Sequence, residues 1–450
     1  MRELREKCAV VGVFGVKNAA KYAYLGLYAM QHRGQEATGI SVSNGERIAT
    51  IKKHGLVSMA YDDRMLERAQ GSIAIGHNRY STAGEHTMMD AQPIFARYAL
   101  GEMAIAHNGN FPTYMKIRKK LIDKGAIFSS SMDTENLIHL VAQSNKTSLR
   151  LRILDALGQV EGAYSLLFLS QKELFAARDP HGFRPLSIAK VDGGYMVASE
   201  TCAFDLAEAE FVRDIEPGEM VVFQEGREPE SIHFAKSIPK QCIFEHIYFA
   251  RPDSFLFGES VYEVRKELGR LLWEEDPIKA DMVIPVPDSS IPHAIGYSQA
   301  SGLPFELGII RNHYVGRTFI EPTQRIRDLK VKRKLSPIRS LIDGKRLVIV
   351  DDSIVRGTTS KKIVSLLKRY GAKEVHMRIA SPAIGFPCYY GIDTPHQNEL
   401  ISHSKSTEEI RDYLAADSLC FLSVAALKKA VHSHGDYCLS CFDGRYFHKR

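Results

Sequence analysis

Short apolar runs that end in polar or charged clusters recur along this chain. The sharpest example is the run at 347–350, which is followed directly by Asp351 and Asp352. A continuous apolar run of this length is typical of a strand buried on both faces of a parallel sheet. Paired aspartates are common in solvated turns, but their position directly after a buried run favours a site at the end of the strand.

A helix is predicted shortly after these carboxylates. Three hydroxyl residues precede an apolar stripe of helical spacing, and a glycine ends it: Thr358, Thr359, Ser360 and Gly371. Backbone N–H groups at a helix N-terminus bind phosphate, and Gly357 lets the backbone come close to it. Carboxylates at the strand end can bind Mg²⁺ or sugar hydroxyls. The stretch 347–360 therefore predicts a site for a phosphorylated ribose.

Strands and helices alternate throughout the second half of the chain. Strands are predicted over 282–286, 307–310 and 375–379, with a helix that ends at Gly302 between the first two. This alternation predicts an α/β domain with a parallel sheet and a ligand crevice at the strand ends. Ser289, which follows the first strand, is expected beside Asp351 and Asp352.

The first half of the chain begins with a predicted buried strand over 8–15 that starts on Cys8. Polar clusters at 31–36, 76–84, 108–110 and 131–135 each lie at the end of an apolar run. Further strands over 164–169 and 195–198, with turns at 182–186 and 216–219, predict an α+β sandwich of sheets covered by helices. The domain boundary is expected near 237–241.

Taken one at a time, these polar residues have ordinary structural explanations. A lone cysteine among valines is most often a core residue, and Asn108 with Gly109 is most often a tight hairpin turn. Arg79 and Asp133 alone would be surface charges. Only their joint occurrence favours a site.

Composition further restricts the class of protein to which this chain can belong. A chain of 450 residues with 44% hydrophobic and 25% charged residues should form about two or three globular domains. A net charge of +6 is small for this length, so we expect local phosphate-binding patches and no nucleic-acid surface. No apolar run reaches the ~20 residues of a membrane span, so a cytoplasmic protein is expected. Seven cysteines, an odd number, favour catalysis or metal binding in a reducing compartment over disulfides.

The polar clusters of the first half, in this order after a near-terminal cysteine, resemble the glutaminase domain of the amidotransferases with an N-terminal nucleophile. The resemblance implies that residues 1–7 are a propeptide and that Cys8, once exposed as the first residue, attacks the side-chain amide of glutamine. Its own α-amino group would serve as the general base, because an α-amine titrates nearer neutrality than a lysine.

The same resemblance assigns the partners of Cys8. The Asn108 side chain and the Gly109 N–H would form the oxyanion hole. Arg79 would bind the α-carboxylate of glutamine and Asp133 its α-ammonium group. Arg33 matches a family arginine close to the nucleophile.

Four further segments make the resemblance more specific: YFARPDS at 248–254, VIPVPDSS at 283–290, YVGRTFI at 314–320 and VDDSIVRGTTS at 350–360. Together they resemble the amidophosphoribosyltransferase family over nearly the whole chain. The implied reaction transfers ammonia from glutamine to C1 of phosphoribosylpyrophosphate. The implied architecture is an αββα N-terminal-nucleophile glutaminase domain over 8–236, followed by a type I phosphoribosyltransferase domain over 237–450.

In the second domain, the resemblance implies that Ser289, Asp351 and Asp352 lie around one Mg²⁺ of the bound substrate. The 5-phosphate would lie on the backbone and hydroxyls of Arg356, Gly357, Thr358, Thr359 and Ser360. Tyr248 would help to couple the two sites. Purine nucleotides as feedback inhibitors and a homotetrameric assembly are also implied.

A basic segment over 316–334 carries seven Lys and Arg residues against Glu321 and Asp328. Such a charge run can be a solvated face or a nucleic-acid contact. The family resemblance instead implies a loop that closes over the pyrophosphate and shields ammonia from water, in which it would become ammonium.

Six cysteines remain besides Cys8, and four of them favour a metal site. Cys438 and Cys441 form a CxxC pair, which alone could mean zinc, a redox pair or chance. With Cys388 and Cys242, four thiolates also suit a 4Fe-4S cluster. Their positions resemble the cluster-bearing subgroup of the family, which implies one cluster per subunit that pins the C-terminal tail. Cys202 and Cys420 are expected to be ordinary buried residues.

Two other functions fit parts of this pattern. A sensor that binds phosphoribosylpyrophosphate or a nucleotide without turnover would not need the glutaminase residues. A free-standing glutaminase would not need the phosphate loop.

Overall fold

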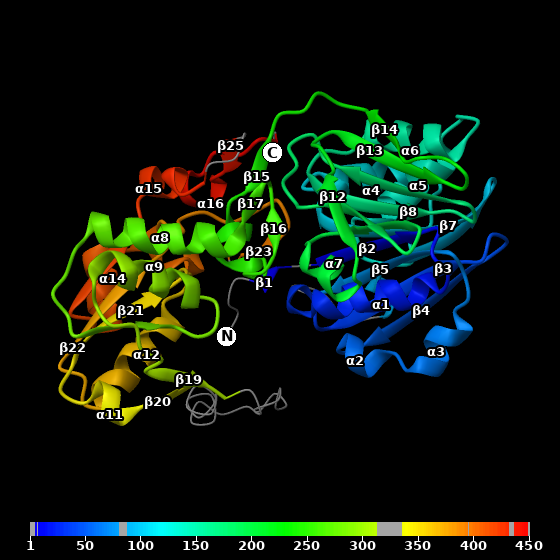
Figure 1. Ribbon diagram of the computed structural model, residues 1–450. Helices are drawn as coiled ribbons and strands as arrows, with labels where there is room; N and C mark the ends of the chain where they lie inside the picture. Colours follow the sequence, from blue (N-terminus) through cyan, green and yellow to red (C-terminus); the bar gives the residue numbers. More distant parts are fainter. Residues whose placement is uncertain are drawn as a thin grey trace.

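The computed structural model describes residues 5–6, 8–80, 88–312, 335–394, 396–431 and 436–448. They form two lobes that lie side by side (Figure 1). The first lobe contains most of the chain up to the strand at 230–233, and the second contains the remainder.

The first lobe contains two mainly antiparallel sheets that face each other. The first sheet has seven strands, in the order β12 (Glu210–Asp214), β10 (Ser187–Val191), β11 (Gly194–Ala198), β2 (Cys8–Phe14), β5 (Ile73–Arg79), β3 (Ala37–Ser43) and β4 (Ile48–His54). The second has six, in the order β14 (Glu230–His233), β13 (Glu219–Gln224), β9 (Glu173–Arg178), β8 (Ala163–Leu169), β7 (Gly101–Asn110) and β6 (Ile94–Tyr98). A buried apolar layer that includes Val10, Ile75, Leu167 and Val221 fills the space between them.

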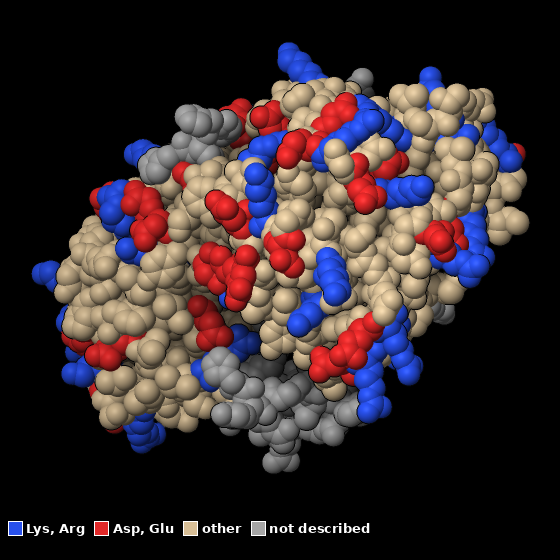
Figure 2. All heavy atoms as spheres, turned by 45° about the vertical axis from the view of Figure 1, so that its right-hand side comes forward, with Lys and Arg blue, Asp and Glu red and all other residues tan. Residues whose placement is uncertain are grey.

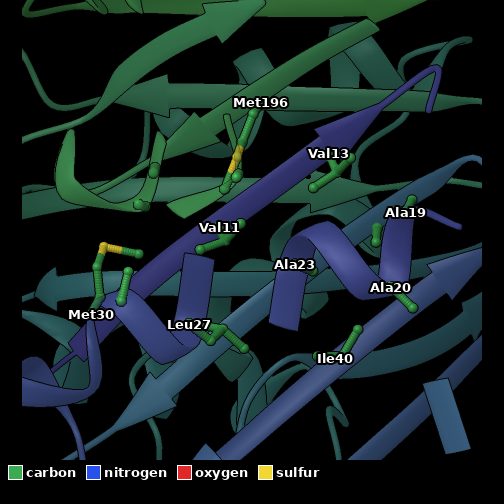
Figure 3. Close-up of a cluster of buried hydrophobic side chains, with 14 of the residues drawn as sticks. Val11, Val13, Ala19, Ala20, Ala23, Leu27, Met30, Ile40 and Met196 are labelled. Carbon is green, nitrogen blue, oxygen red and sulfur yellow. The ribbon is translucent and has the colours of Figure 1, made fainter. Parts of the chain in front are cut away.

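Helices cover the outer face of each sheet. On the first sheet, α1 (Ala19–Ala29) packs Leu27 and its alanines against Val11 and Met196 (Figure 3). Gly26 allows this close packing, because a Cβ there would lie 2.6 Å from Met196 Cε. On the second sheet lie α4 (Tyr114–Asp123), α5 (Glu135–Gln143) and α6 (Leu149–Leu157). The helix–sheet–sheet–helix order confirms the predicted sandwich.

The second lobe contains a four-stranded parallel sheet, as predicted. Its order is β18 (Met282–Pro285), β21 (Arg346–Asp351), β22 (Glu374–Ile379) and β24 (Ser418–Phe421). Alternate residues of β21 face opposite cores: Val348 packs towards α8 (Val261–Glu275) and α9 (Ile291–Ser301), and Ile349 towards α12 (Thr358–Arg369) and α14 (Thr407–Leu414). The strand is therefore buried on both faces.

One predicted strand of this sheet was assigned wrongly. The segment expected at 307–310 forms β19 (Ile309–Arg311), which pairs antiparallel with β20 (Leu335–Pro337) outside the parallel sheet. Ile310 is 42% exposed, so β19 lacks the two buried faces of a central strand. Strand β24, which the sequence reading missed, occupies the sheet edge instead, where its four residues are only half-buried.

Short elements join the lobes. Strand β15 (Lys240–Cys242) pairs in parallel with β25 (Asp436–Cys438) near the C-terminus, and β1 (Arg5–Glu6) pairs with β23 (Ile392–Asp393). A π-helical turn, η3 (Glu245–Phe249), follows β15. Such turns are rare and often lie at functional sites.

Two expectations from the sequence concern membrane-spanning helices and the distribution of surface charge. Within the described parts of the chain, no helix has both the length and the apolar character that crossing a membrane requires. Lys and Arg are interspersed with Asp and Glu on the face that Figure 2 displays, as expected for a small net charge.

Candidate active sites and cysteine cluster

Cys8 lies at the first position of β2 and is 6% exposed. In the register of the first sheet, Cys8 is directly opposite Arg79, the last residue of β5. The two predicted glutaminase residues therefore lie next to each other at one end of the sheet.

Asn108 and Gly109 lie near the end of β7 in the facing sheet. The strand continues through both residues, so the hairpin-turn alternative is wrong. Asn108 Nδ2 lies 3.5 Å from Ser199 Oγ, and the same hydroxyl accepts a hydrogen bond of 3.0 Å from the N–H of Val10. Ser199, which the sequence reading missed, thus ties the oxyanion candidate to the strand of the nucleophile.

Asp90, which the sequence did not point to, links Arg79 to the loop that carries Asp133. Asp90 Oδ2 lies 3.6 Å from Arg79 Nη2, and the Asp90 carboxylate accepts hydrogen bonds from the N–H and hydroxyl of Ser131. Asp133, two residues further on, accepts a 3.0 Å hydrogen bond from the N–H of Phe111. Asp90 therefore fixes the arginine relative to the loop that carries Asp133.

Arg33 belongs to a buried ion network between the lobes. Its Nε donates to the carbonyl of Cys8 at 3.1 Å, and its guanidinium pairs with Glu200 and Glu245. Arg184 Nη2 lies 3.0 Å from the same Glu245 carboxylate. The side chains of Arg33, Arg184, Glu200 and Glu245 all have an exposed fraction of zero. Buried charges of this kind depend on one another, because removal of one leaves another without compensation.

Glu200 also forms hydrogen bonds with the YFARPDS segment at 248–254. It accepts hydrogen bonds from the N–H of Arg251 at 2.9 Å and from the hydroxyl of Ser254 at 2.8 Å. Burial alone would raise the pKa of Glu200, but His32 and Arg33 hold it below its usual range. The carboxylate therefore stays charged at neutral pH, and it anchors the second lobe to the first.

The π-helical turn is held from its other side by Arg265 of α8. The Nε of Arg265 donates to the carbonyl of His246 at 2.7 Å, and its Nη2 donates to that of Ala250 at 2.8 Å. Burial lowers the pKa of Arg265 to about 10, and the nearby Asp352 opposes this shift. Tyr248 lies in this turn, three residues after Glu245, and is an electrostatic neighbour of Arg265, as is Asp352.

The predicted carboxylates lie where β21 ends. Asp351 and Asp352 are 7% and 6% exposed. Ser289 Oγ donates to Asp352 at 2.6 Å, and Ser290 Oγ lies 3.3 Å from Asp351. Ser290 was missed, although its place in the same VIPVPDSS segment was a usable signal.

The segment proposed to bind phosphate forms the N-terminus of α12, so the predicted helix start is confirmed. Gly357 precedes the helix with φ at +70°, and no acidic residue lies in the first turn, which holds Thr358, Thr359 and Ser360. The first turn therefore presents backbone N–H groups without a competing carboxylate. The side chain of Arg356 is paired with Glu399 at 2.7 Å.

Four cysteines from distant segments meet near the lobe junction. The register of β15 and β25 sets Cys242 opposite Cys438, Cys441 follows in α16 (Ser440–Asp443), and Cys388 packs against Cys438. None of the four forms a disulfide in the described structure. Burial raises the pKa of Cys438 to about 12, and the pKa of Cys441 is raised by burial and by the other three thiols.

Four cysteine thiols are the ligand type that iron–sulfur clusters use. Among the described residues, no three His, Cys, Asp or Glu side chains are gathered closely enough for a single ion. A four-iron cluster needs a wider spacing, because each cysteine binds a different iron. Cys202 is buried in the first lobe, as predicted, but Cys420 is only half-buried because β24 is an edge strand.

Several predicted features lie outside the described residues. They include the basic segment 316–334, the segment at 314–320, part of the polar cluster at 76–84 and most of the expected propeptide.

Both lobes match known protein families. Residues 77–205 match the glutamine amidotransferase domain family, and residues 259–381 match the phosphoribosyl transferase domain family. The chain is 51% identical over 445 residues to amidophosphoribosyltransferase 2, chloroplastic, of Arabidopsis thaliana, covering 98% of this chain and 79% of the relative. It is 46% identical over 455 residues to the amidophosphoribosyltransferase of Bacillus subtilis, covering 99% of this chain and 95% of the relative.

The fold of the chain also matches that of a solved structure. Glutamine phosphoribosylpyrophosphate amidotransferase from B. subtilis, complexed with ADP and GMP, superposes with a TM-score of 0.93 at 45% identity. The match covers 98% of this chain and 97% of that one.

Proposed function

Because this chain belongs to the amidophosphoribosyltransferase family, we propose specific roles in its reaction for the residues that the two lobes bring together. The enzyme transfers ammonia from glutamine to C1 of 5-phosphoribosyl-1-pyrophosphate and forms 5-phosphoribosylamine, glutamate and pyrophosphate, the first committed step of purine biosynthesis. The observation that carries our assignment is the Arg33 network, because it joins the main chain of Cys8 to Glu245 at the start of the second lobe.

Glutamate release in the presence and absence of phosphoribosylpyrophosphate tests this assignment. We expect release to depend on phosphoribosylpyrophosphate, since the two sites share one buried network. A nucleotide or phosphoribosylpyrophosphate sensor would release no glutamate, and a free-standing glutaminase would release it equally under both conditions.

In the first lobe, Cys8 is the proposed nucleophile. Its thiol gives its proton to its own α-amine and attacks the amide carbon of glutamine, so that ammonia leaves and a thioester forms, which water then hydrolyses to glutamate. Arg79 and Asp133 would bind the two charged groups of the amino acid. Arg33 donates a hydrogen bond to the main-chain carbonyl of Cys8, so we assign it a positioning role.

Replacing Asn108 with alanine tests the proposed oxyanion hole. Loss of one donor should reduce the glutamine-dependent rate by roughly 10²–10³-fold, because the donor stabilises charge that develops only in the transition state. The rate with free ammonia should be retained, since that reaction bypasses Cys8. Equal loss of both activities would refute the assigned role.

The N-terminal residues give a second prediction. An α-amine is available on Cys8 only after residues 1–7 are removed, so the active enzyme should have the mass of a chain that starts at position 8. Intact mass spectrometry of the purified, active protein measures this directly. Full activity with Met1 to Lys7 still attached would contradict the proposed general base.

In the second lobe, Ser289, Asp351 and Asp352 are the residues that would hold Mg²⁺ with the pyrophosphate. The cation neutralises charge on the leaving group when bound. The first turn of α12, from Arg356 to Ser360, would bind the 5-phosphate through its N–H groups and hydroxyls. Tyr248 lies in the turn that starts at Glu245 and is held by Arg33 and Arg265, which supports a role in coupling the two sites. The segment 316–334 remains the proposed cover that excludes water.

Cys242, Cys388, Cys438 and Cys441 are the residues that would hold a 4Fe-4S cluster. Its role would be structural, because β15 and β25 bring the C-terminal tail against the lobe junction. We expect about four irons per chain in protein purified without oxygen, and their loss in Cys438→Ser. Iron analysis and the visible absorption of the protein test this, with Cys420→Ser as the matched control that should retain the metal. Stoichiometric zinc would overturn the assignment.

The remaining proposals concern the whole enzyme. We propose domains at 8–236 and 237–450, a boundary that lies between β14 and β15. The bound ADP and GMP of the B. subtilis structure support purine nucleotides as inhibitors. We propose a homotetramer by family resemblance, and a cytoplasmic location because free thiols are maintained in a reducing compartment.

A further inference from the structure

A short segment of the second lobe, residues 388–392, touches the end of β7 in the first lobe, which carries Asn108 and Gly109. The side chain of Asn110, next to Gly109, donates a 2.9 Å hydrogen bond to the carbonyl of Tyr389. A Cβ placed on Gly391 would lie 3.2 Å from the Cα of Gly109 and 3.3 Å from its carbonyl carbon. The two glycines therefore lie backbone against backbone.

The segment around Gly391 is held firmly in this position. The ring of Tyr390 stacks on Phe183 with centroids 4.1 Å apart and planes 11° apart. The hydroxyl of Tyr390 also accepts a 2.6 Å hydrogen bond from the N–H of Phe447. Gly391 itself has φ at +109°, a conformation that other residues rarely adopt. The segment therefore cannot easily retreat from Gly109.

Gly109 is confined on its other side as well. A Cβ there would lie 2.0 Å from the carbonyl oxygen of Ala163 in β8. Contacts with β8 and with the second lobe thus fix the peptide that presents the Gly109 N–H.

We propose that Gly391 is a positioning residue for the glutaminase reaction. Because Gly391 has no side chain, its backbone packs directly against Gly109 and fixes the position of the Gly109 N–H. The second lobe thereby completes the oxyanion hole of the first. This inference rests on the proposed function of Gly109. It means that ammonia is released efficiently only when the second lobe is seated, which would limit wasteful hydrolysis of glutamine. The next residue, Ile392, pairs with Glu6, so the same segment also holds the chain that precedes Cys8.

Gly391→Ala tests the proposal, because it adds one methyl group against Gly109. The glutamine-dependent kcat should fall roughly 10- to 10²-fold, as expected for a displaced donor. The KM for glutamine should not change, because Arg79 and Asp133 are untouched, and the ammonia-dependent rate should also be retained. Gly55→Ala is the matched control: Gly55 has a similar φ of +99° but nothing lies within 4 Å of the added Cβ, so it carries the backbone strain without the contact and should retain both rates.

A second variant separates positioning from misfolding. Asn110→Ala removes the hydrogen bond to Tyr389 without adding any atom, and it should lower the glutamine-dependent kcat less strongly but with the same selectivity. Unchanged kcat in both variants, or an equal fall in the ammonia-dependent rate of Asn110→Ala, would overturn the proposal. A lack of phosphoribosylpyrophosphate-dependent glutamate release from the unmodified enzyme would instead overturn the proposed function.

Discussion

Cys8→Ala should abolish the glutamine-dependent reaction and leave the ammonia-dependent reaction intact. The expected loss is roughly 10⁴–10⁶-fold, because no neighbouring group can replace the thiolate as nucleophile. The reaction with free ammonia needs only the second lobe, whose carboxylates and phosphate loop are unchanged. Initial rates with each nitrogen source, measured on the same preparation, give the comparison.

The matched control is Cys420→Ala, which removes a half-buried thiol on the edge strand β24. It should retain both activities. Retained glutamine-dependent activity in Cys8→Ala would show that another residue is the nucleophile. Equal loss of both activities would show instead that Cys8 acts through the fold.

Asp351→Asn and Asp352→Asn should each reduce both activities by roughly 10³-fold, because loss of a magnesium ligand removes several kcal/mol of charge stabilisation. Both carboxylates are buried at the end of β21, and each is contacted by a serine of the adjacent VIPVPDSS segment. Asparagine keeps the shape of the side chain and removes its charge. The effect should therefore fall on catalysis with little change in folding.

This second prediction is checked by rates with glutamine and with ammonia across a range of Mg²⁺ concentrations. Asp412→Asn is the control, since Asp412 is an exposed residue of α14 in the same lobe. A selective loss of only the glutamine-dependent rate would place the aspartates in coupling and contradict their assigned role. Loss of only the glutamine-dependent rate in Cys8→Ala, and loss of both rates in the aspartate variants, would thus define two separate sites.

The Arg33 network gives a physical basis for communication between these sites. Arg33 connects the carbonyl of Cys8 to Glu245 at the start of the π-helical turn, and Arg265 holds the same turn close to Asp352. Each member is a buried charge, so displacement of one is costly for the others. A displacement of this turn would therefore affect both the contact of Arg33 with Cys8 and the surroundings of Asp352.

Much of the secondary structure could be predicted because its signals are local. The run at 347–350 forms most of β21, and the stripe that follows it forms α12, because burial periodicity is set by adjacent residues. The weaker local patterns did not predict the structure correctly. Strand β19 was assigned to the wrong sheet and β24 was missed, because both are short and their partners are determined by packing.

The residue types of both sites were also evident from the sequence: a near-terminal cysteine, an Asn–Gly pair, and two carboxylates after a buried strand. Their supporting residues were not. Asp90, Ser199 and Glu245 are ordinary polar residues whose importance depends on what they contact. Asn110 and Tyr389, 279 positions apart, meet only because the two lobes dock.

The sequence by itself indicated the chemistry proposed for this chain, because the proposed nucleophile, the carboxylates and the proposed phosphate loop are short local patterns. The tertiary structure alone decided how that chemistry is arranged. It set Gly391 against Gly109, gathered four distant thiols, and joined Cys8 to the second lobe through Arg33. These contacts connect residues far apart in the chain, so they depend on the packing of two complete lobes and leave no local pattern.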